Sequence, residues 1–138
     1  MTIDHVSRKT AVMLRENGFD ELCYAFYIDD EQDVKFSQNW CRNHALNSNY
    51  KEHEFYTAPS LFSAKRWIKD KYGLFIEIRC EWVKGKSIFD NDVCHGYCYL
   101  VTTLKRPSSV KEEYLLSDEI YDSENLALDS AIQHALTL

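Results

Sequence analysis

The sequence predicts a single α+β domain over residues 1–138, with a mixed or antiparallel β-sheet and about three helices packed on one face. Three observations lead to this fold class. The length of 138 residues suits one ordinary domain. Three segments have helix caps and apolar residues at helical spacing, and several others alternate apolar and polar residues as strands do. Only four glycines and two prolines interrupt the chain, which favours ordered elements over disorder.

The first two predicted helices begin and end in the same way. Ser7 is expected to cap a helix that runs to Asn17, and Ser60 a helix that runs to Tyr72. A glycine follows each helix and can adopt the left-handed conformation that ends it. An apolar residue and a predicted strand come next, so the helix–glycine–strand unit occurs twice and suggests a weak internal repeat.

The predicted strands follow these helices. ELCYAFYID (21–29) and FIEIRCEWV (75–83) alternate in the manner of half-buried strands. KGKSIFDND (84–92) has the composition of a hairpin turn, and VCHGYCYLVTTL (93–104) is expected to be the return strand. The charged residues of 75–83 share one face, so we expect one buried face and one wet face.

The C-terminal part of the chain is predicted in less detail. Residues 111–121 have no clear period, and hold at most a short edge strand around Tyr114–Leu116. A closing helix is expected over residues 124–136, with Asp122 or Ser123 as its cap.

Three segments resemble a known family. TAPSLFSAKRWIKDKYGLFIEI, the tryptophan in CEWV and the ending YDSENLALDSAIQHALTL are similar to a family of small uncharacterised proteins from Bacteroides-type gut bacteria and their phages or mobile elements. The similarity extends from the opening helix to the end of the chain. It implies a small α+β fold and a bacterial or phage cytoplasm. It implies no activity and brings no catalytic residue to this sequence.

Composition narrows the classes of function. The net charge of −6 and the pI of about 5.3 count against a general affinity for nucleic acid. No apolar run is long enough to span a bilayer, and the first residues lack a signal-peptide pattern. Five cysteines cannot all pair with one another, so a reducing compartment is the simpler interpretation. We therefore expect a cytoplasmic protein without a membrane partner.

The stretch VCHGYCYL, residues 93–100, is the strongest candidate for chemistry. A regular strand places Cys94 and Cys98 on one face, about 13 Å apart, too far to share a metal ion or form a disulfide with each other. Only a turn, or a bulge at Gly96, would change this. Core packing is therefore the favoured interpretation of Cys94, Cys98 and, on the facing strand, Cys80.

Cys41 and His44, a C-x2-H pair, define the enzyme alternative. With Cys94 or Cys98 they would supply a nucleophilic thiol and its base. With those two cysteines and Cys80 they would supply the ligands of a metal site. No third residue that would orient the histidine can be named, and no glycine-rich loop offers a phosphate site. An enzyme is therefore the less favoured class, and no catalytic residue or cofactor is predicted.

Aromatic residues around a polar segment predict a contact surface. SQNWCRNHALNSNYKEHE, residues 37–54, lacks periodicity and is predicted to be a long surface loop, a kind of segment that often carries function. Trp40, Tyr50 and Tyr56 lie in or beside it, and such side chains often anchor protein partners.

Charge is unevenly distributed along the chain. Residues 112–138 include seven acids and no lysine or arginine, whereas four cations crowd the segment from Lys65 to Lys71. A solvated helix face explains this more simply than a partner surface. Arg66 and Trp67 nevertheless make this segment the candidate for a weak nucleic-acid-binding module, because a tryptophan among cations can stack on a base.

The favoured function is a small, non-catalytic accessory protein that binds another macromolecule, most simply a protein. A homodimer is left open. The metal- or thiol-dependent enzyme and the nucleic-acid-binding module are the alternatives.

Overall fold

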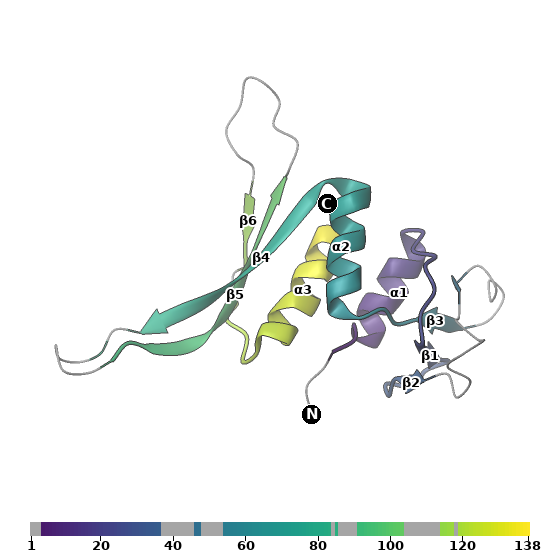
Figure 1. Cartoon of the computed structure of the whole chain (residues 1–138). Helices are drawn as coiled ribbons and strands as arrows, with labels where there is room; N and C mark the ends of the chain where they lie inside the picture. The colour runs from purple at the N-terminus through teal and green to yellow at the C-terminus, as the bar shows by residue number, and fades with distance from the viewer. Residues whose placement is uncertain are drawn as a thin grey trace, which may run out of the picture.

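The computed structural model of the chain describes residues 4–36, 46–47, 54–83, 85, 91–103, 114–117 and 119–138. The elements in these ranges are arranged as helix, three short strands, helix, three strands and helix (Figure 1). In chain order they are α1 (Arg8–Glu16), β1 (Ala25–Ile28), β2 (Lys35–Phe36), β3 (Phe55–Thr57), α2 (Leu61–Tyr72), β4 (Leu74–Val83), β5 (Val93–Thr103), β6 (Tyr114–Leu116) and α3 (Glu124–Leu136).

The three predicted helices are confirmed, with serine caps. The side chains of Ser7, Ser60 and Ser123 each accept a hydrogen bond from a backbone N–H of the first helical turn. Gly18, with φ 88°, follows α1, and Gly73, with φ 65°, follows α2, so both adopt the left-handed conformation that glycine tolerates best. In the described part of the chain, no helix has the length and apolar character needed to cross a membrane.

The strands divide into two antiparallel sheets rather than the single sheet expected from the sequence. Their strand orders are β2-β1-β3 and β4-β5-β6. The predicted hairpin is confirmed by the pairing of β4 with β5, and the predicted edge strand is β6. The strand predicted at 21–29 is shorter: Leu22 and Tyr24 are exposed, and the strand itself spans Ala25–Ile28.

The helices lie between the two sheets (Figure 1). α2 and α3 pack on β4, and α3 also packs on β5, whereas α1 packs on α3 and β3. Two of the three helices therefore cover the large sheet, and α1 connects them to the small one. The largest fully buried apolar side chains come from helices, a strand and loops, and are Val6, Leu14, Phe19, Ile68, Ile76 and Ile132.

A buried carboxylate joins α1 to α3. Asp129 of α3 is 8% exposed, and its Oδ1 accepts a hydrogen bond of 2.8 Å from the backbone N–H of Ser7. Its Oδ2 accepts one of 2.7 Å from the Ser7 hydroxyl and one of 3.2 Å from the amide of Gln133. A carboxylate is also favoured at a helix N-terminus by the helix dipole. This contact fixes where α1 begins relative to α3.

The hairpin of β4 and β5 extends beyond the helices (Figure 1). Ile76 near the start of β4 is fully buried, whereas Trp82 is 63% exposed, although the alternation of the strand places both on the same face. The predicted division into one buried and one wet face is therefore correct only where helices cover the sheet.

Candidate functional site

The structure describes six of the ten residues that the sequence singled out. Trp40, Cys41, His44 and Tyr50 lie outside the described residues. Their predicted roles as partner contacts, as a nucleophile with its base or as metal ligands stay predictions. The six described candidates lie in β3, α2, β4 and β5, and are Tyr56, Arg66, Trp67, Cys80, Cys94 and Cys98.

Cys80 and Cys94 form a disulfide, which corrects the expectation that both are unpaired core residues. Their Cα atoms are 6.0 Å apart, within the range that a disulfide spans. The bond removes two thiolates from the proposed metal site, since the thiolate is the form of cysteine that binds metal. Within the described residues, no three His, Cys, Asp or Glu side chains gather as metal ligands would.

A β-bulge in β5 brings these two cysteines together. The pairing of β5 with β4 shifts near the end of the hairpin and leaves His95 as an extra residue. One extra residue moves the side chains beyond it to the other face. Cys94 therefore shares a face with Cys80, and Cys98 lies on the opposite face. The sequence placed Cys94 and Cys98 on one face because a regular strand was assumed.

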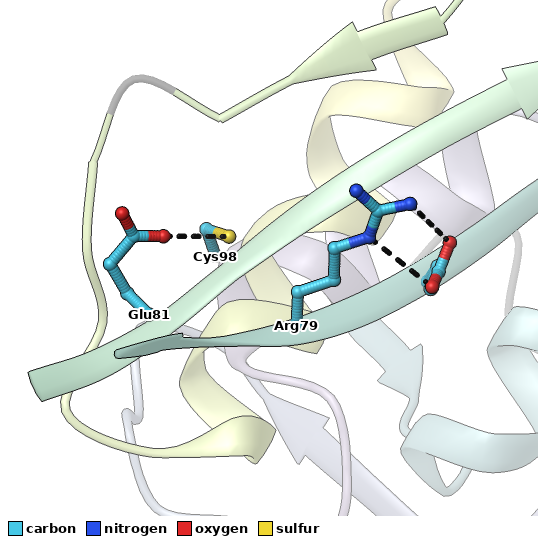
Figure 2. Close-up of polar contacts among 4 residues, drawn as sticks. Arg79, Glu81 and Cys98 are labelled. Atoms are coloured by element: carbon cyan, nitrogen blue, oxygen red, sulfur yellow. Dashed lines mark hydrogen bonds and ion pairs between the residues drawn. The ribbon is translucent and has the colours of Figure 1, made fainter. Parts of the chain in front are cut away.

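The free cysteines among the described residues are poorly suited to nucleophilic catalysis. The Sγ of Cys98 lies 3.8 Å from Oε2 of Glu81 on the neighbouring strand (Figure 2). Burial, followed by the negative charge of Glu81, raises the pKa of the Cys98 thiol. Burial raises the pKa of Cys23 to about 11. A reactive thiol needs a lowered pKa, so neither residue has the environment of an activated nucleophile.

Tyr56 contacts cations of its own chain. The guanidinium carbons of Arg8 and Arg15, both on α1, lie 5.5 and 5.1 Å from the centre of the Tyr56 ring, within the range of cation–π contacts. The half-buried ring also packs against the core. These contacts hold β3 against α1, and a role for Tyr56 in partner binding stays a prediction.

Trp67 and Arg66 occupy different sides of α2. The Trp67 ring lies edge-on to Phe19 and Tyr72, with centroid distances of 5.2 and 5.8 Å, and Nζ of Lys71 is 4.7 Å from its centre. Successive residues of a helix are about 100° apart around its axis, and Arg66 is exposed. The helix thus has an aromatic packing side and a separate basic side.

The basic side of α2 forms one wall of a groove of about 310 Å³, and the start of β4 forms the other wall. Helix positions i, i+3, i+4 and i+7 lie on one side, and four lining residues of α2 have this spacing. We call this site the basic groove; its residues are Phe62, Lys65, Arg66, Lys69, Leu74, Phe75 and Ile76.

The basic groove has an apolar floor and two solvent-accessible rings. Phe62 is 73% exposed and Phe75 is 39% exposed. The Nζ of Lys65 lies 5.3 Å from the centre of the Phe75 ring. Neighbouring exposed apolar side chains rimmed by polar groups mark interaction sites on soluble proteins.

The cations of the basic groove are not neutralised by the described part of the chain. The ion pairs found in these ranges lie on β4 and at the start of β2, and neither involves Arg66 or Lys69. Lys65 contacts an aromatic ring rather than a carboxylate. The groove therefore combines apolar surface with positive charge that a ligand can neutralise.

A second cavity of about 530 Å³ is lined by residues of α1, β5 and α3 and of the segment before α3. Three polar side chains that line this cavity, those of Tyr99, Gln133 and His134, bond to one another or to neighbouring residues. The hydroxyl of Tyr99 is 2.8 Å from Nδ1 of His134, and the amide of Gln133 donates to Thr10 and Asp129. Groups that are already paired offer less to a ligand, so the basic groove is the stronger candidate.

Comparisons with protein-family models, with curated proteins and with solved structures find no match. The proposed function is therefore based on the residues that line the basic groove. Arg66, which the sequence singled out, lines this groove together with Phe62 and Phe75, which the sequence did not single out. The available signal was Phe62 at helical spacing from Lys65, Arg66 and Lys69, an aromatic residue in an otherwise basic stripe.

Proposed function

We propose that this chain is a non-catalytic protein-interaction module that binds an acidic segment with an apolar anchor side chain in the basic groove. The observation that carries the proposal is the combination of an apolar floor with cations that have no carboxylate partner among the described residues. Charge attracts and orients the partner, and burial of the anchor supplies affinity.

Apolar surface in the groove favours a peptide over a nucleic acid. A leucine or phenylalanine of a peptide can enter between Phe62 and Phe75, and its acidic neighbours can then meet the three cations. A nucleic acid needs a longer basic track that follows its phosphates, and the chain as a whole carries a net charge of −6. The nucleic-acid-binding alternative through Lys65–Lys71 is therefore the less favoured one.

We also propose a biological setting. The sequence resemblance suggests a bacterial or phage accessory protein. A cytoplasmic location stays a prediction. The disulfide between Cys80 and Cys94 counts against it, because disulfides persist mainly in oxidising compartments.

A peptide titration tests the proposed function. The probe is a fluorescein-labelled peptide in which Leu and Phe are flanked by Glu and Asp, and its binding is followed by anisotropy. The matched control peptide has Lys at every acidic position. We expect the acidic peptide to bind at least tenfold more tightly, about 1.4 kcal/mol in binding free energy, and to bind less tightly as salt is raised.

Two variants locate the binding. Arg66→Glu is expected to weaken binding of the acidic peptide about tenfold or more, whereas Lys9→Glu makes the same charge change on exposed α1 and leaves binding within about twofold. A thymidine oligonucleotide that binds more tightly than the peptide, with a steep dependence on salt, would replace the proposal with the nucleic-acid alternative.

A further inference from the structure

We infer that the acidic segment bound by the basic groove is residues 119–126 of a second copy of this chain. The inference rests on the proposed function of the groove and names its occupant. The proposed function leaves the source of the acidic segment open, whereas residues 119–126 of this same chain carry a surface that complements the groove.

Residues 119–126 have the chemistry that complements the groove. Glu119, Asp122 and Glu124 are exposed carboxylates. Between and beside them, Ile120 is 49% exposed and Leu126 is 41% exposed. None of these carboxylates forms an ion pair within the ranges that the structure describes. Acids around two apolar side chains match cations around an apolar floor.

The segment already has a defined shape. The backbones of Tyr97 and Tyr121 exchange two hydrogen bonds of 2.8 and 2.7 Å, and the Ser123 side chain caps α3. Ile120 lies directly over Gly96, where a Cβ would stand 2.3 Å from Cγ2 of Ile120. A preformed segment loses little conformational entropy when it binds, so its exposed side chains can dock without prior folding.

The segment cannot reach the groove of its own chain. Gly96, beneath Ile120, pairs with Glu81, which is five residues along β4 from Ile76 at the groove. Five residues of strand span about 17 Å. In Figure 1, α2 meets β4 at the upper end of the layer of helices, whereas α3 starts at its lower end. Contact between the two surfaces therefore requires a second copy.

The resulting contact is head to tail. Each copy has one groove and one 119–126 segment, and these are different surfaces. Such a heterologous interface either closes into a ring or continues as an open chain of subunits. We therefore expect self-association that increases with protein concentration and weakens with salt.

Sedimentation velocity of the full chain tests this inference. Arg66→Glu/Lys69→Glu disables the groove, and Glu119→Gln/Glu124→Gln disables the segment without giving it a charge that the altered groove would attract, so each variant alone should sediment as a 16.3 kDa monomer. An equimolar mixture still contains one intact groove and one intact segment. It should form a complex of twice that mass and grow no further, whereas the wild-type chain forms larger species or a closed ring.

Matched controls accompany these variants. Lys35→Glu on β2 and Glu16→Lys on α1 change exposed charges and should leave assembly unchanged, and thermal unfolding verifies that every variant is folded. A wild-type chain that remains monomeric at all concentrations overturns the inference, as does assembly that survives Arg66→Glu/Lys69→Glu. If the wild type is monomeric and the acidic peptide still binds the groove, only this inference falls. If the peptide fails as well, the proposed function falls with it.

Discussion

Single residues fix the relative position of the helices. The Asp129 carboxylate accepts hydrogen bonds from the backbone and the side chain of Ser7, 122 positions away in sequence, and from Gln133. Because Asp129 is 8% exposed, water cannot easily replace it as the acceptor. The start of α1 and the middle of α3 therefore depend on one side chain.

Asp129→Ala is expected to lower the free energy of unfolding by about 2–3 kcal/mol, because buried donors lose their acceptor. Urea unfolding followed by circular dichroism measures the change. Glu16→Ala, an exposed acid on α1, is the control and should change stability by less than about 0.5 kcal/mol. Equal stabilities of the two variants would show that the Asp129 contacts contribute nothing.

Cys23 is expected to resist alkylation in the folded protein. With a pKa raised to about 11 by burial, only about 0.1% of the thiol is ionised at pH 8, and the thiolate is the reactive form. Iodoacetamide labelling followed by mass spectrometry should show Cys23 modified slowly in buffer and rapidly in urea. Equal rates in both solvents would contradict the burial of this side chain.

At the scale of elements, local sequence signals were sufficient for the helices and the hairpin. Each helix begins at a serine whose side chain can reach a free N–H, and this requirement is visible in the sequence. The sequence allowed a bulge at Gly96 only as an exception. The bulge at His95 could not be predicted, because one inserted residue does not produce a recognisable change of period in VCHGYCYL, where apolar and polar residues do not alternate regularly. The pairing of Cys80 with Cys94 depends on that bulge and was missed with it.

The disulfide is expected to stabilise the hairpin of β4 and β5. Cys80 and Cys94 are separated by 14 positions, and closing a loop of this length stabilises a protein by up to about 3 kcal/mol in the chain-entropy model. Cys80→Ser/Cys94→Ser should therefore lower the urea midpoint, and a reducing agent should lower that of the wild type but not that of the variant. Cys98→Ser is the control and should remain sensitive to reduction. A wild-type midpoint that ignores reduction would argue against the bond.

At the scale of the whole molecule, the layered arrangement creates the basic groove. The groove forms where α2 turns at Gly73 into β4, so that a basic helix side faces the first residues of a strand. The sequence indicated the basic helix but not its neighbour, since the pattern of one element does not specify which surface packs beside it. For the same reason, one sheet was predicted where the structure has two, because apolar and polar residues alternate along a short strand in the same way whichever strand it pairs with.

The same arrangement separates the groove from residues 119–126. The helices lie between the sheets (Figure 1). The groove lies at the start of β4, whereas the acidic segment lies beside Gly96 and Tyr97, further along the hairpin. Opposite charges at distant places on one molecule favour contacts between copies over contacts within one copy.

The most direct test of the central claim is a chemical-shift titration of ¹⁵N-labelled protein with the acidic Leu-Phe peptide. We expect the amide signals that move to belong to the groove residues, which lie within 62–76. Arg66→Glu should abolish the movement, and Lys9→Glu should preserve it. Signals that do not move, or that move mainly around the Tyr99–His134 cavity, would contradict the assignment of the basic groove as the binding site.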